Sequence, residues 1–243
     1  MLRTPPQVTV VALPGTGSDA DFAARAFGPA AAARGWALHA VEPDPQAVIA
    51  SYIAALDAAA ARGPVLAAGI SLGAAVALDW AAGQPTAVVG VITALPAWTG
   101  AETAACPAAL SASVTAGQLR ADGLDAVLAR MRASSPPWLA AALTRSWRSQ
   151  WPHLPQALDE AAAYAWPTRE QLATITVPVA VVGASDDPVH PIAVAEEWAS
   201  DLPHASLRRV TLAELGENPA ILGEAGFAEL DATLASSTLP TTT

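Results

Sequence analysis

The chain of 243 residues carries 22 acidic and 12 basic side chains, and its formal net charge is −10 at neutral pH. Lysine is absent, and the arginines form no cluster. Nucleic acids and anionic membranes attract basic surfaces, so this charge balance argues against both as partners. A small-molecule substrate is the expected partner, and no feature of the sequence indicates a particular oligomeric state.

The composition is that of a globular protein, since 53% of the residues are hydrophobic and only 14% are charged. No unbroken apolar run approaches the roughly 18 residues of a membrane span. Cys106 is the single cysteine, which rules out an internal disulfide and fits a reducing compartment, so we expect a cytoplasmic protein. No Cys–His spacing suggests zinc, and the sequence implies neither a metal nor an organic cofactor.

Short apolar runs alternate with helical runs along the chain. Strands are expected at residues 7–13, 36–41, 65–68, 86–95, 177–182 and 205–212. Helices are expected at residues 21–34, 46–62, 74–82, 191–200 and 219–235. This alternation predicts an α/β fold, a doubly wound and mostly parallel sheet of about six strands with helices on both faces. Its site should lie beyond the carboxyl ends of the strands, where the strand order reverses.

A long insertion, residues 99–176, separates the fourth and fifth strands and contains only helical patterns. We expect residues 1–98 and 177–235 to form the core, the insertion to form a helical cap or lid, and residues 236–243 to be a flexible tail. Five of the eight tryptophans lie in or beside the insertion: Trp98, Trp138, Trp147, Trp151 and Trp166. They can fill a small core of the cap's own. The first four can also line an apolar substrate pocket, and the two interpretations are compatible.

Residues 69–73 read Gly-Ile-Ser-Leu-Gly and lie between an apolar strand and a helical run. This is the G-x-S-x-G pattern in the strand–turn–helix context of a nucleophile elbow. The sharp turn would lift the Ser71 hydroxyl above the sheet, and Gly69 and Gly73 would allow strand and helix to pack closely. The N–H of Leu72, at the helix start, would face an oxyanion. An ordinary strand-to-helix turn is the alternative.

With this elbow in place, the chain resembles the α/β-hydrolase family over nearly its whole length, starting where that family's third strand usually falls. The resemblance implies a serine hydrolase with a helical cap, in which Ser71 is the nucleophile. It also implies a second oxyanion donor in the turn after the first core strand, where the family usually has His-Gly and this chain has Pro14-Gly15. The Thr16 N–H is the first choice for this donor and Gly17 the second. A glycine-rich turn without a ligand is the alternative.

The resemblance places the catalytic acid in residues 183–191, which are similar to the family's Gly-x-x-Asp-x-x-x-Pro segment with one extra residue. Counting from Gly183 selects Asp186, and counting back from Pro191 selects Asp187. We prefer Asp187, because Pro188 would follow it into the next helix. The other carboxylate would then cap that helix.

The chain departs from the family where the catalytic base is expected. The family has Gly-His-x-Pro after the last strand, whereas this chain has Gly-Glu-Asn-Pro at residues 216–219, and no histidine follows. Removing the base from a serine triad costs on the order of a millionfold in turnover. His190, three residues after Asp187, is the preferred replacement, because the two side chains can hydrogen bond and the loop can reach inward by roughly 10 Å, two strand spacings. Glu217 in a dry site is the alternative base.

The other three histidines have structural or solvent roles as their simplest interpretation. His39 lies within a strand, His204 precedes the last strand, and His153 lies in the insertion and could project from the cap.

The sequence therefore predicts a serine hydrolase of a carboxylic ester or thioester with an apolar acyl or ring group. Ser71, His190 and Asp187 would act as nucleophile, base and orienting acid, and Leu72 and Thr16 as oxyanion donors. Two alternatives stay open. One is a lyase, isomerase or cyclase of the same fold that uses Glu217, and the other is an inactive protein that binds a small molecule.

Overall fold

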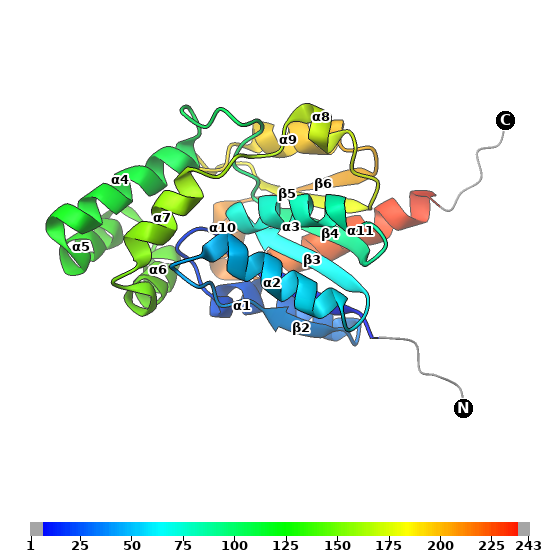
Figure 1. The fold of residues 1–243 in the computed structure, drawn as a ribbon, viewed down its shortest axis with the longest axis horizontal. Helices are drawn as coiled ribbons and strands as arrows, with labels where there is room; N and C mark the ends of the chain where they lie inside the picture. Colours follow the sequence, from blue (N-terminus) through cyan, green and yellow to red (C-terminus); the bar gives the residue numbers. More distant parts are fainter. Residues whose placement is uncertain (1–6, 238–243) are drawn as a thin grey trace.

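The computed structural model describes residues 7–237. Within them, six parallel strands form one sheet in the order β2-β1-β3-β4-β5-β6. The strands are β1 (Thr9–Leu13), β2 (Ala37–Ala40), β3 (Val65–Ile70), β4 (Val88–Ala94), β5 (Val179–Ala184) and β6 (Ala205–Val210). The strand order reverses between β1 and β3, so the expected doubly wound sheet and its switch point are both present (Figure 1).

Helices cover both faces of the sheet (Figure 1). One face carries α1 (Ala20–Ala33) and α11 (Ile221–Ser237), and the other carries α2 (Val48–Ala60), α3 (Leu72–Gly83) and α9 (Ile192–Asp201). Successive strand residues point to opposite faces, so Val10 packs with Phe27 and Phe227 on the first face, while Val11 packs with Tyr52 on the second. Burial on both faces explains why the inner strands read as continuous apolar runs.

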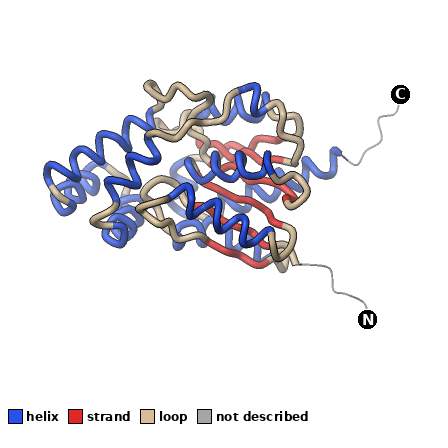
Figure 2. The backbone as a smooth tube through the Cα atoms, viewed as in Figure 1, coloured by secondary structure: helices blue, strands red, loops and turns tan. Residues whose placement is uncertain are grey.

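Five helices and no strand lie between β4 and β5. They are α4 (Pro107–Asp122), α5 (Leu124–Ser134), α6 (Pro137–Gln150), α7 (Leu154–Ala162) and α8 (Arg169–Leu172). Helices α4–α7, called here the cap helices, project beyond one end of the sheet, whereas α8 lies beside α9 (Figures 1 and 2). The cap helices share a hydrophobic cluster that includes Leu119, Leu128, Trp147, Leu154 and Leu158.

The cap helix α7 is fastened to the core through the start of α2. Glu160 accepts hydrogen bonds from the N–H groups of Val48 at 2.8 Å and Ile49 at 3.0 Å. Ala47, the residue before α2, has a methyl side chain that cannot accept a hydrogen bond from these N–H groups. A carboxylate from the cap therefore caps a core helix from 112 residues away.

Most element boundaries differ from those expected by a few residues, and two differences concern new features. The sixth strand ends at Val210, because Thr211 caps a short helix, α10 (Leu212–Glu217), through a reciprocal capping box with Glu214. The predicted flexible tail begins within α11, which runs to Ser237, and residues 238–243 lie outside the described residues. Across residues 7–237, no helix combines the length and hydropathy that crossing a bilayer requires.

Candidate active site

The turn at Ser71 has the backbone of a nucleophile elbow. Its dihedral angles, φ 53° and ψ −116°, lie outside the regions that side-chain-bearing residues favour, at a cost on the order of 1–3 kcal/mol. The Ser71 N–H donates to the Ala94 carbonyl of β4 at 2.8 Å, and α3 starts at the next residue. The strained turn holds the serine at the carboxyl end of β3.

The two glycines of the motif make this turn sterically possible. A Cβ on Gly69 would lie 2.1 Å from the Gly73 carbonyl oxygen, and a Cβ on Gly73 would lie 2.5 Å from the Leu13 carbonyl oxygen at the end of β1. Neither position has room for a side chain, so the close packing expected of an elbow is present.

Ser71, His190 and Asp187 lie in a hydrogen-bonded row. The His190 Nε2 atom is 3.0 Å from Ser71 Oγ, and its Nδ1 atom is 2.7 Å from Asp187 Oδ2. With the imidazole proton on Nδ1 and donated to the carboxylate, Nε2 is free to accept the Ser71 proton. This is the relative arrangement of nucleophile, base and orienting acid in serine hydrolases.

The loop between β5 and α9 brings the last two of these residues to Ser71. The strand β5 is two positions from β3 in the sheet, a lateral distance of about 10 Å. The second oxygen of Asp187, Oδ1, accepts the N–H groups of Val189 at 2.8 Å and His190 at 3.2 Å. The loop therefore folds around the carboxylate, and this folding directs the imidazole inward.

The environment of Asp187 favours its ionised form. Burial acts to raise the pKa of this carboxyl, but the hydrogen bond and charge of His190 and the two backbone N–H groups outweigh it and lower the pKa. Only 9% of the Asp187 side chain and 17% of the His190 side chain are exposed, so water screens their interaction weakly. A carboxylate held in this way fixes the orientation of the imidazole.

The neighbouring carboxylate, Asp186, does not join this row. Its side chain is exposed, and Oδ1 accepts the N–H of Leu212, the first residue of α10, at 2.8 Å. We expected the second carboxylate to cap the helix that follows in the sequence, which is α9. It caps α10 instead, because β6 places the start of α10 beside this loop.

Neither Glu217 nor any of the other three histidines makes a hydrogen bond to Ser71 within the described residues. Glu217, at the end of α10, is exposed, and its side chain makes no hydrogen bond or ion pair with any described residue. The dry environment that the Glu217 hypothesis requires is therefore absent. His39, His153 and His204 are likewise exposed, on β2, before α7 and before β6.

Two backbone N–H groups beside Ser71 are available as oxyanion donors. The turn of residues 14–17 lies against the serine, since a Cβ on Gly15 would be 3.5 Å from Ser71 Cβ. The Leu72 N–H is the first of α3 and has no acceptor within the helix. Neither this group nor the Thr16 N–H donates to another residue in the described part of the chain.

The four tryptophans predicted to line a substrate pocket fall into different surroundings. Trp147 belongs to the hydrophobic cluster of the cap helices, and Trp138 stacks near Phe22 with ring centroids 6.3 Å apart. Trp98 packs at the edge of the core cluster around α2, α3 and α9, and Trp151 is 40% exposed on the cap surface. They do not form one continuous wall, and helix α6 carries only Trp138 and Trp147.

The sequence matches the model of the alpha/beta hydrolase family over residues 2–228. The chain therefore belongs to this family. No curated protein matches the sequence.

Solved structures with the same fold cover nearly the whole chain. MenH from S. aureus is 16% identical over 97% of this chain and 94% of its own, with a TM-score of 0.65. The enol-lactonase from Burkholderia xenovorans LB400 is 14% identical over 98% and 94%, with a TM-score of 0.66. A thermophilic esterase from Thermogutta terrifontis is 13% identical over 96% and 89%, with a TM-score of 0.64. At these identities the likeness concerns the fold.

Proposed function

We propose that this protein is a serine hydrolase that cleaves a carboxylic ester or thioester through an acyl-enzyme on Ser71. The observation that carries the proposal is the row of contacts from Ser71 Oγ to His190 Nε2 at 3.0 Å and from His190 Nδ1 to Asp187 Oδ2 at 2.7 Å. A serine hydroxyl is a weak nucleophile until a base removes its proton. In this arrangement the base is within hydrogen-bond distance of that proton.

The reaction would proceed in two halves. Ser71 Oγ attacks the carbonyl carbon while His190 Nε2 takes the hydroxyl proton, and the N–H groups of Leu72 and Thr16 hold the negative charge on the carbonyl oxygen. The tetrahedral intermediate then breaks its bond to the alcohol or thiol, which leaves with the proton from His190. Water, deprotonated by His190, attacks the acyl-serine and releases the carboxylic acid and the free serine. Asp187 keeps the imidazole in one tautomer and stabilises its positive form.

The surroundings of the turn favour an apolar acyl or ring group. Ile70, which precedes Ser71, and Leu95 belong to a buried apolar cluster that includes Ala142 of α6, and Trp138 of α6 packs against it. Apolar walls with a few placed polar groups are typical of small-molecule sites. Among the similar structures are an esterase and an enol-lactonase, and a lactone is a cyclic ester.

A fluorophosphonate probe tests the proposal directly, because it reacts with an activated serine and adds a defined mass. We expect one adduct on the wild-type protein, none on Ser71→Ala, and a strongly slowed reaction on His190→Ala. Turnover of p-nitrophenyl butyrate should follow the same order. Absence of an adduct, under conditions that label a control esterase, would reject the hydrolase function and favour binding of a small molecule without catalysis.

A further inference from the structure

The turn that carries the Thr16 N–H is held by hydrogen bonds to its carbonyl groups. Tyr52, fully buried in α2, donates its hydroxyl to the Pro14 carbonyl at 2.9 Å. Within the turn, the Ser18 N–H donates to the Gly15 carbonyl at 3.0 Å. These bonds fix the backbone on either side of Thr16. The Thr16 N–H itself donates to no other described residue.

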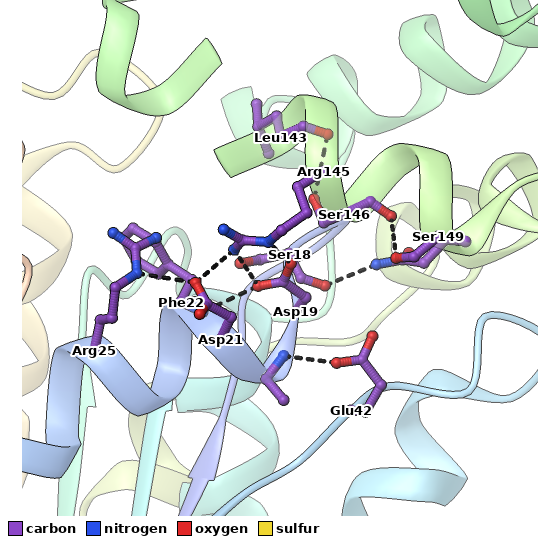
Figure 3. Close-up of polar contacts among 12 residues, drawn as sticks. Ser18, Asp19, Asp21, Phe22, Arg25, Glu42, Leu143, Arg145, Ser146 and Ser149 are labelled. Carbon is purple, nitrogen blue, oxygen red and sulfur yellow. Dashed lines mark hydrogen bonds and ion pairs between the residues drawn. The ribbon is translucent and has the colours of Figure 1, made fainter. Parts of the chain in front are cut away.

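Cap helix α6 completes this set of contacts. Ser146, only 1% exposed, donates its hydroxyl to the Gly17 carbonyl at 2.7 Å, and Gln150 donates to the Ser18 carbonyl at 2.7 Å. Arg145 makes a two-pronged contact with Asp19 at 2.8 and 2.9 Å (Figure 3). The helix therefore holds residues 17, 18 and 19 in succession.

The contact from Ser146 is connected to Thr16 through two planar peptide units. The Gly17 carbonyl and the Ser18 N–H belong to one unit, and the Gly15 carbonyl and the Thr16 N–H belong to another. Ser146 holds the first unit through its carbonyl, and the Ser18 N–H of that unit holds the second through the Gly15 carbonyl. Each bond in such a row also polarises the next one, so the terminal N–H becomes a stronger donor.

Close packing of α6 against Gly17 also restrains the turn that carries these hydrogen bonds. Gly17 has φ +68°, and a Cβ there would lie 2.9 Å from the Trp147 Nε1 atom. Trp147 follows Ser146 in α6 and is itself 7% exposed. A helix turn seated this tightly against Gly17 defines the position of its carbonyl.

We propose that Ser146 is a positioning residue for the oxyanion site, which orients the Thr16 N–H through the peptide units 17–18 and 15–16. The inference rests on the proposed function, because it assigns the cap a part in stabilising the transition state. The cap helices would then contribute to catalysis. A small displacement of an oxyanion donor is costly, because its strength depends on prior alignment.

The test compares Ser146→Ala with Ser149→Ala. Both serines lie in α6, but the Ser149 hydroxyl donates to the Ser146 carbonyl at 2.8 Å and does not reach the turn (Figure 3). With p-nitrophenyl butyrate, we expect Ser146→Ala to lower kcat about tenfold with little change in KM, and Ser149→Ala to match the wild type. Thermal unfolding of both variants shows that each is folded.

A second measurement separates positioning from a general loss of structure. The affinity of an alkyl boronic acid, which forms a tetrahedral adduct on the serine, should fall in Ser146→Ala by the same factor as kcat/KM. The affinity of the acid product, butyrate, should stay unchanged. An equal loss for both ligands, or unchanged kcat in an active protein, would overturn the positioning role alone. Absence of turnover in the wild type would instead overturn the proposed function, and the oxyanion role with it.

Discussion

Two loops of this molecule could supply the proposed base, and only the loop after β5 reaches Ser71. The loop after β5 directs His190 to within 3.0 Å of Ser71 Oγ. The second loop, residues 216–219 from the end of α10 onward, keeps the glycine and proline that flank the family's histidine, but its Glu217 is exposed to solvent. If His190 is the base, the sheet edge sets where the base must lie, and different loops can supply it. A triad is recognised by its geometry and not by its sequence position.

In the proposed triad, the acid and the base come from one short segment. Asp187 and His190 are three residues apart, and the Asp187 Oδ1 atom also binds the His190 N–H at 3.2 Å. The two residues are positioned together by the same turn, whereas a histidine on the second loop would need both loops to be placed independently.

The largest expected effect on turnover distinguishes His190, in the first loop, from Glu217, in the second, as the base. His190→Ala should lower kcat/KM for p-nitrophenyl butyrate by roughly 10⁵- to 10⁶-fold, because it leaves the serine without a base. Glu217→Ala should change it by less than about threefold, because the side chain is exposed and unpaired among the described residues. A loss in Glu217→Ala comparable with that in His190→Ala would assign the base to the second loop.

A smaller effect separates two adjacent carboxylates within the first loop. Asp187→Asn should reduce kcat by about 10⁴-fold, because an amide can donate to Nδ1 and favour the wrong tautomer of His190. Asp186→Asn should leave kcat within about threefold of the wild type, since Asp186 binds the Leu212 N–H and not the imidazole. Steady-state kinetics at pH 8 measures both. Equal losses would mean that the two carboxylates share the role.

The lowered pKa of Asp187 predicts a pH dependence of stability. A carboxyl with a lower pKa in the folded than in the unfolded state stabilises the fold above its unfolded value of about 3.9, and this contribution is lost as the pH falls through the folded value. Urea unfolding should therefore show Asp187→Asn less stable than the wild type at pH 7, by a margin that narrows below about pH 4. A margin independent of pH would show that the carboxyl's ionisation is not linked to folding.

Much of the fold could be predicted from the sequence, because the relevant signals are local. The strand–turn–helix at Ser71 is contiguous, and the alternation of apolar and helical runs gave all six strands of the sheet. The pairing of Asp187 with His190 could also be predicted, since the two residues lie three positions apart in one loop. The distance of two strands from β5 to the elbow follows from the family's strand order, and the sheet has that order.

The contacts made by the cap could not be predicted in this way. Ser146 lies 129 residues from Gly17, and Glu160 lies 112 residues from Val48, so no spacing or motif connects them. The surroundings of the tryptophans predicted to line a pocket could not be predicted from their spacing either. Trp147 and Trp151 are four residues apart, yet one is buried in the cap cluster and the other lies on the surface, because α6 ends at Gln150.

The smallest expected effect concerns Asp186 as the cap of α10. Its carboxylate binds the N–H of Leu212, while Thr211 and Glu214 form the capping box of the same helix. Asp186→Ala should lower the free energy of unfolding by about 1 kcal/mol, the usual cost of losing a cap, and leave turnover nearly unchanged. Asp186→Asn is the matched control, because its amide oxygen can still accept the bond, and it should lose less. Urea unfolding measures both variants. A loss of activity in Asp186→Ala without a loss of stability would show that the exposed carboxylate acts on the site, and the distinction between the two neighbouring acids would fail.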